Sequence, residues 1–107
     1  MAQYMLQVTY SQSGWAAQIK NPANRMQQVG KIVKKMGGKL QQAWYTFGKY
    51  DLVAILDMPD DVTMGAFSMA AAAGGALSRA VTTPLMSVEQ GTEMIRKAAE
   101  SGYRPPE

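Results

Sequence analysis

The stretch Phe47-Gly48-Lys49-Tyr50-Asp51 decides the fold of this chain, because it joins two extended runs by a short turn. Residues 39–47 and residues 51–57 both have the composition of β-strands, and so short a connection makes them pair as an antiparallel hairpin. Glycine suits the positive φ that such turns require. The second run is nearly all apolar, which predicts a central strand that is covered on both sides.

Two further strands flank the hairpin in the sequence. Residues 4–10 alternate between two sets of side chains with a period of two, which is typical of a half-buried strand. Residues 77–85 form the last predicted strand, and Pro84 within it cannot donate to a ladder, which indicates an edge position or a strand end.

Helical spacing and capping residues predict four helices between and after these strands. The apolar side chains of the second recur at helical intervals, whereas the third is rich in alanine and carries little bulk. The four are a short helix at residues 15–20 capped by Ser11 or Ser13, a helix begun by Asn21-Pro22 and ended by Gly37-Gly38, a helix capped by Asp60 or Asp61 that ends near Gly74, and a helix at residues 87–101 with a capping box between Ser87 and Gln90.

The order of elements predicts an α+β protein with the ferredoxin-like split βαββαβ fold, a four-stranded antiparallel sheet and an extra C-terminal helix. We expect one domain over residues 1–102 and a tail at residues 103–107. Two helices then cover one face of the sheet and leave the other open. We expect a second copy of the chain to cover that open face, giving a homodimer built as a dimeric α/β barrel, or a larger homo-oligomer.

Composition narrows the possible chemistry. The 107 residues include neither Cys nor His, which removes disulfides, thiolate and imidazole metal ligands and the commonest general base. We therefore expect no metal site and no cofactor. The start has neither a signal peptide nor a membrane span, so we expect a cytoplasmic protein without membrane contact. A net charge of +3 and a lysine cluster on a predicted helix, without a base-reading motif, make nucleic acid an unexpected partner.

Several motifs carry a family resemblance. The runs Met36-Gly37-Gly38-Lys39-Leu40, Trp44 to Asp51 and Met58-Pro59-Asp60-Asp61 are similar to the GYD-domain family, named for the residues that stand here at Gly48, Tyr50 and Asp51. The resemblance covers roughly residues 3 to 95 and implies a bacterial protein of dimeric α/β-barrel type. A similar hairpin occurs in effector-binding domains of leucine-responsive regulators, and similar sheets in barrel monooxygenases and stress-responsive proteins. The absence of histidine departs from the monooxygenases that use it.

The candidate site residues each have a structural and a functional interpretation. The favoured interpretation of Gly48, Tyr50 and Asp51 is structural, with glycine supplying a positive φ and Asp51 accepting from backbone amides. The alternative places Tyr50 and Asp51 at the mouth of an intersheet cavity. Tyr45 and Phe47 either pack in the core or dimer interface, or line an apolar pocket with Gln7 and Thr9. Arg79 pairs with a carboxylate of the protein or, alternatively, of a ligand.

The leading functional hypothesis is a non-catalytic homo-oligomeric module that binds a small molecule or assembles with a partner protein. The alternative is a cofactor-independent dimeric-barrel enzyme that acts by proton transfer on a small organic substrate around Tyr45, Tyr50, Asp51 and Arg79. A third possibility is a larger homo-oligomer built through the alanine-rich helix. We expect no catalytic residue under the leading hypothesis, because no histidine activates the Ser and Thr hydroxyl groups.

Overall fold

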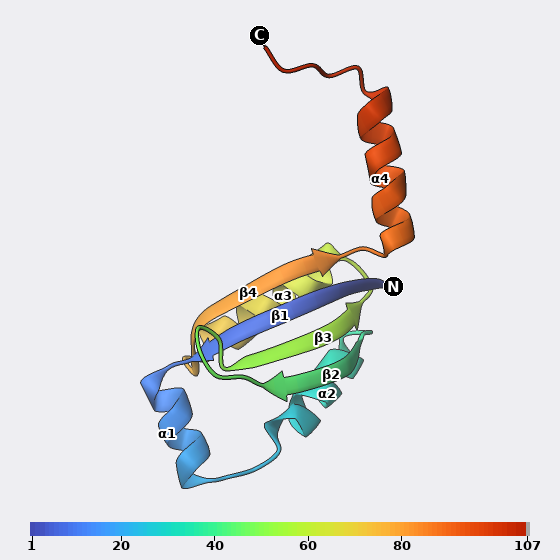
Figure 1. Cartoon of the computed structure of the whole chain (residues 1–107). Coiled ribbons are helices and arrows are strands. Elements are labelled where there is room, and N and C mark those ends of the chain that lie inside the picture. The colour runs from blue at the N-terminus through green and yellow to red at the C-terminus, as the bar shows by residue number, and fades with distance from the viewer. Residues whose placement is uncertain (107) are drawn as a thin grey trace.

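The chain forms a four-stranded antiparallel sheet with helices packed against one face (Figure 1). The computed structural model describes residues 1–106. The sheet has the order β2-β3-β1-β4, so the two strands of the hairpin lie next to each other and β1 is inserted between β3 and β4. This is the predicted ferredoxin-like arrangement. The strands are β1 (Ala2–Tyr10), β2 (Lys39–Tyr45), β3 (Leu52–Met58) and β4 (Leu77–Leu85).

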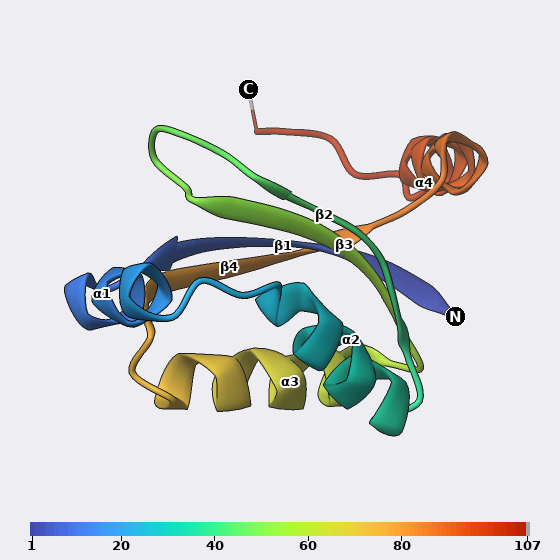
Figure 2. The same cartoon turned by 90° about the horizontal axis from the view of Figure 1, so that it is seen from below.

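Helices α2 and α3 lie side by side under one face of the sheet, whereas α1 lies beyond one end of it (Figure 2). Helix α4 follows β4 and projects away from the sheet, on the side opposite α2 and α3. The face without helices is called the open face below. The helices are α1 (Gln12–Lys20), α2 (Arg25–Lys35), α3 (Asp61–Ala73) and α4 (Val88–Glu100).

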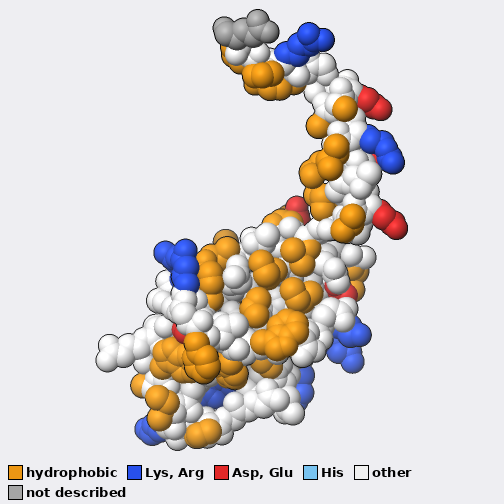
Figure 3. Space-filling view, viewed as in Figure 1, with side chains coloured by type: hydrophobic (Ala, Val, Ile, Leu, Met, Phe, Trp, Pro, Cys, Tyr) orange, Lys and Arg blue, Asp and Glu red, His pale blue; other side chains and the backbone are white. Residues whose placement is uncertain are grey.

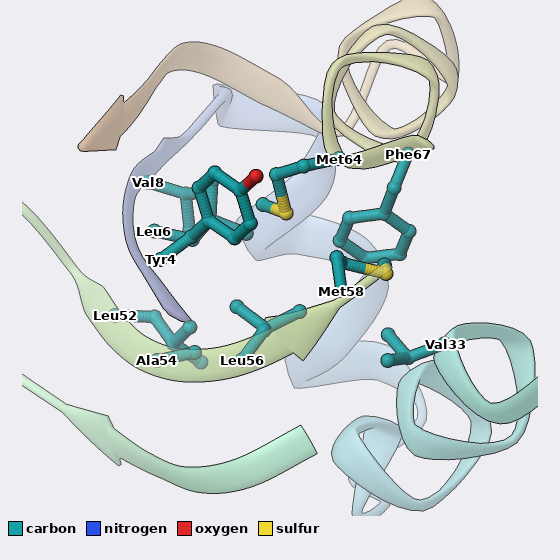
Figure 4. Packing of buried hydrophobic residues seen from close by; sticks show 10 residues of the cluster. All are labelled: Tyr4, Leu6, Val8, Val33, Leu52, Ala54, Leu56, Met58, Met64 and Phe67. Carbon is teal, nitrogen blue, oxygen red and sulfur yellow. The ribbon is translucent and has the colours of Figure 1, made fainter. Parts of the chain in front are cut away.

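The core lies between the sheet and the pair α2 and α3 (Figure 4). Strands β1 and β3 bury every second side chain, because successive side chains of a strand point to opposite faces. Helix α2 adds one fully buried side chain and α3 adds two. The buried set is Tyr4, Leu6, Val8, Val33, Leu52, Ala54, Leu56, Met58, Met64 and Phe67.

The second predicted helix begins later than the sequence pattern indicated. Asn21 is the C-cap of α1, and its N–H donates to the carbonyl of Ala17 at 3.1 Å. Asn24 caps α2 instead, since its side chain accepts from the N–H of Met26 at 3.1 Å. The prediction of a helix start at Asn21-Pro22 is therefore wrong, because Asn21 already ends the preceding helix.

Strand β3 has the predicted central position, but the helices cover only one of its faces. Leu52, Ala54 and Leu56 are buried on the helix side, whereas Val53 and Ile55 on the other side are half-buried. The prediction of cover on both sides is therefore not met within one chain. Strand β2 also ends at Tyr45 instead of residue 47.

Two predictions from single residues are confirmed. Pro84 lies in β4, which is an edge strand, so its missing N–H removes no bond from the interior of the sheet. Ser87 and Gln90 form the predicted capping box, because each side chain accepts from the backbone N–H of the other residue at 3.0 Å. Within residues 1–106, no helix combines the length and the apolar character that crossing a bilayer requires.

The Tyr4 hydroxyl ties β1 to the first turn of α3 by donating to Asp61 Oδ1 at 2.5 Å. This bond, together with burial and the charges of Asp61 and Asp60, raises the pKa of Tyr4 to about 12. The raised pKa favours the folded state below the ordinary tyrosine pKa of about 10. That stability is lost as the pH rises through the folded value.

We expect the stability of the parent protein to fall between pH 10 and pH 12 more steeply than that of Tyr4→Phe, which has no phenol to titrate. Urea unfolding followed by circular dichroism at intervals from pH 9 to pH 12 measures the difference. Equal slopes for the two proteins would contradict the role assigned to Tyr4.

Candidate functional site

The hairpin turn between β2 and β3 holds the residues that the sequence singled out. Gly48 has φ of +116°, which a side chain at this position would strain. The Thr46 N–H donates to the carbonyl of Asp51 at 2.8 Å, and the Thr46 hydroxyl donates to the carbonyl of Tyr50 at 2.7 Å. These bonds close the loop and fix the positions of Tyr50 and Asp51.

Asp51 joins the hairpin to the end of β1. Its Oδ2 accepts from the backbone N–H of Tyr10 at 2.9 Å, and its own N–H donates to the carbonyl of Val8 at 2.8 Å. Val8–Leu52 is the last pair of the β1–β3 ladder, so the N–H of Tyr10 has no strand partner on that side. The carboxylate of Asp51 satisfies it.

Thr9 makes a second connection, since its hydroxyl donates to the carbonyl of Lys49 at 2.9 Å. Tyr50 is half-buried, and Lys49 Nζ lies 5.7 Å from the centre of its ring. The Asp51 carboxylate and the Tyr50 ring thus both make their contacts with other residues of the same chain. The arrangement is that of a clamp that fixes three strands relative to one another.

The other predicted site residues do not share one face of the sheet. Gln7, Thr9 and Arg79 lie on the open face, because Thr9 stands opposite Arg79 in the β1–β4 ladder and Gln7 is two residues away. Tyr45 stands opposite Leu52, which is buried on the helix side. The structure therefore brings together Gln7, Thr9 and Arg79, and it separates Tyr45 from them.

Tyr45 contacts α1 instead of the open face. Its hydroxyl donates to Gln18 Oε1 at 3.1 Å, and its ring centre lies 6.5 Å from that of Trp15. Phe47 is fully exposed in the loop, away from Gln7 and Thr9 of the proposed pocket. The apolar pocket of Tyr45 and Phe47 with Gln7 and Thr9 is accordingly not formed by a single chain.

Arg79 has no carboxylate within ion-pair distance among residues 1–106. Its side chain is exposed next to Thr9, and the expected pair with a carboxylate of the same chain is not formed. The described residues also contain no group of three acidic side chains that could hold a metal ion.

The open face carries an apolar surface that sequence reasoning described only in general terms (Figure 3). Cross-strand partners place side chains from all four strands on it, because directly paired residues share a face. Alternation in residues 2–10 and the unbroken apolar run of β3 were the signals that could have identified these residues. We call this set the open-face patch: Met5, Trp44, Val53, Ile55, Val81 and Leu85.

The clamp assigned to Asp51 gives a test of its structural role. Asp51→Ala leaves the Tyr10 N–H without its partner, and we expect a loss of about 1–2 kcal/mol in the free energy of unfolding. Asp51→Asn retains an acceptor oxygen and is expected to lose less than half of that. Urea denaturation of the three proteins measures both values, and equal losses in the two variants would show that the charge, not the hydrogen bond, is what matters.

The fold is similar to several solved structures. FFRP-DM1 aligns with a TM-score of 0.52 at 13% identity, over 80% of this chain and 100% of that one. MtbAldR aligns with a TM-score of 0.56 at 13% identity over 80% of this chain, which spans about half (52%) of that protein. TTHA0845 from Thermus thermophilus aligns with a TM-score of 0.52 at 15% identity, over 81% and 95% of the two chains. At these identities the likeness shows the fold alone.

No curated protein sequence matches the chain significantly. The family model described as the GYD domain matches residues 4–95, which include nearly the whole sheet, α1 to α3 and the first half of α4. The match contains the clamp of Gly48, Tyr50 and Asp51 in full. This chain belongs to the GYD-domain family.

Proposed function

We propose that this protein is a non-catalytic homo-oligomeric assembly module in which a second copy covers the open face, as in a dimeric α/β barrel. The observation that carries the proposal is the open-face patch. Its side chains lie across all four strands, and no helix of the described chain lies over them. Contiguous apolar surface of this kind is rare on monomers and marks interaction sites.

The size of the exposed surface supports the same proposal. A compact monomer of 11.6 kDa exposes about 5,800 Å², whereas this chain exposes 7864 Å². Its radius of gyration is 17.2 Å, compared with about 13 Å for a compact domain of this length. The excess of roughly 2,000 Å² exceeds the 800 Å² or so that each partner buries in a standard stable interface.

Helix α4 accounts for much of this extended shape. It contacts the rest of the chain little and contains no buried residue, yet one side of it is apolar. It projects on the same side of the sheet as the open face (Figure 2). We expect a second copy on that face to cover the apolar side of α4 as well. The apolar side consists of Val88, Gly91, Met94, Ile95 and Ala98.

A small-molecule role at the same interface would use polar side chains of the open face. Gln7, Thr9 and Arg79 lie there together, and the free guanidinium suits an anionic group. The enzyme hypothesis finds less support. It needs Tyr45, Tyr50, Asp51 and Arg79 to converge, but Tyr45 contacts α1 and Asp51 is bonded to the backbone of β1.

Substitution in the centre of the open-face patch tests the assembly. Ile55→Glu places a charge in the middle of the sheet, and we expect the dissociation constant of the oligomer to rise at least about thirtyfold. Val62→Glu is the matched control, because Val62 is 83% exposed on α3 and lies on the helix side. Sedimentation velocity at micromolar concentration measures the effect. A monomeric parent protein, or equal behaviour of both variants, would contradict the proposal.

The contribution of α4 is tested separately. Ile95→Gln removes an apolar side chain from the exposed side of α4, and we expect a rise of about tenfold in the dissociation constant. Arg96→Gln is the control, since it removes only an exposed pair with Glu93. Native mass spectrometry counts the subunits of each variant. An unchanged oligomer in Ile95→Gln would show that α4 stays free in the assembly.

A further inference from the structure

An apolar cavity of about 210 Å³ lies on the other side of the sheet, between the strands and helices α2 and α3. Side chains from β1, β3 and α3 point toward this region in Figure 4, and α2 completes its wall. Small residues line part of it, among them Ala54, Ala71 and Ala76, and their lack of bulk leaves the space unfilled. The larger lining residues include Leu6, Leu56 and Phe67.

The cavity is open to solvent on one side, because Arg25 and Ala71 of its lining are partly exposed and Ala76 is exposed. A ligand can therefore enter it without opening the core. An apolar cavity of about 150 Å³ is enough to bind benzene. The cavity of this chain therefore has room for an apolar body of about six to eight carbon atoms.

Only two polar side chains line the cavity, Arg25 and Tyr10. The guanidinium of Arg25 donates to the carbonyl of Ala17 at 3.2 Å and to that of Asn21 at 3.3 Å. A guanidinium has five N–H groups, so donors remain. Among residues 1–106, no carboxylate forms an ion pair with Arg25.

The Tyr10 side chain supplies a second donor at the same place. Its ring is held edge-on against Trp15, with the ring centres 4.9 Å apart. Burial and the neighbouring Tyr45 raise the pKa of Tyr10, and the Arg25 charge opposes the rise, so the phenol remains protonated at neutral pH. Its hydroxyl makes no hydrogen bond to the described part of the chain. The carboxylate of Asp51, which also raises the pKa of Tyr10, is bonded to the Tyr10 backbone.

We propose that this cavity binds a small monocarboxylate with an apolar body of about six to eight carbon atoms. The body fills the space between the sheet and the helices, and the carboxylate accepts from Arg25 and the Tyr10 hydroxyl. This site is distinct from the open face, because the sheet lies between the two. A second copy bound to the open face would leave the cavity accessible.

Calorimetry on the full chain with octanoate and with 1-octanol separates the two parts of the proposal. We expect the parent protein to bind both, and octanoate more tightly. Arg25→Gln is expected to weaken octanoate by about tenfold or more and to leave octanol unchanged. Arg25→Lys keeps the positive charge but loses the contacts with Ala17 and Asn21. We expect it to retain most of the preference for octanoate, which would show that the charge, and not those contacts, binds the carboxylate.

A second variant tests the cavity itself. Ala71→Leu fills the space and is expected to abolish binding of both ligands without loss of thermal stability. Ala70→Leu is the control, because Ala70 is exposed on the same helix and does not line the cavity. Absence of binding to the parent protein, unchanged binding in Ala71→Leu, or equal weakening of octanol and octanoate in Arg25→Gln would overturn the proposal. Sedimentation of the same samples reports the oligomeric state independently.

Discussion

The structure depends on the position of β3, which carries apolar side chains on both faces of the sheet although helices cover only one face. Strand β3 is apolar on both faces, yet the chain supplies helices for only one of them. Burying Leu52, Ala54, Leu56 and Met58 against α2 and α3 provides the core. The same strand then necessarily presents its other side chains on the open face, because successive residues alternate. Alternation places these side chains on the open face, but the core does not require them to be apolar, so Val53 and Ile55 indicate that this face is also covered.

The clamp at Asp51 explains why a motif can define a family and still say little about activity. Its carboxylate holds the end of β1 beside the hairpin, and the glycine supplies the backbone conformation that the loop needs. These residues connect the end of β1 to the hairpin of β2 and β3, so they fix β1 relative to the hairpin. The groups that we propose for contacts with outside molecules lie elsewhere, at Arg79 on the open face and at Arg25 on the helix side.

Much of the fold could be predicted because local signals agreed with the tertiary structure. Alternation in β1, Pro84 at the edge and the capping box before α4 are all local, and all were found as expected. The face of the sheet on which Tyr45 lies was not predictable from local signals. The register of β2 shifts between Leu40 and Gln42, so uninterrupted alternation from Leu40 places Tyr45 on the open face, whereas the shift turns it to the helix side. The place of α4 was likewise beyond local signals, because nothing in its sequence says what its apolar side contacts.

The same two strands border both apolar regions of the molecule. In β1, Leu6 and Val8 face the cavity while Met5 and Gln7 face the open side, and β3 divides its residues in the same manner. Because alternate residues of each strand line the cavity and the open face, a shift of either strand by one residue would move every side chain to the opposite face. The two regions are therefore specified by the same stretches of sequence. The Asp51 clamp prevents such a shift by fixing β1 and the hairpin together. The motif of Gly48, Tyr50 and Asp51 thus helps to determine which side chains of β1 and β3 face the cavity and which face the open side. Its own residues lie in neither region.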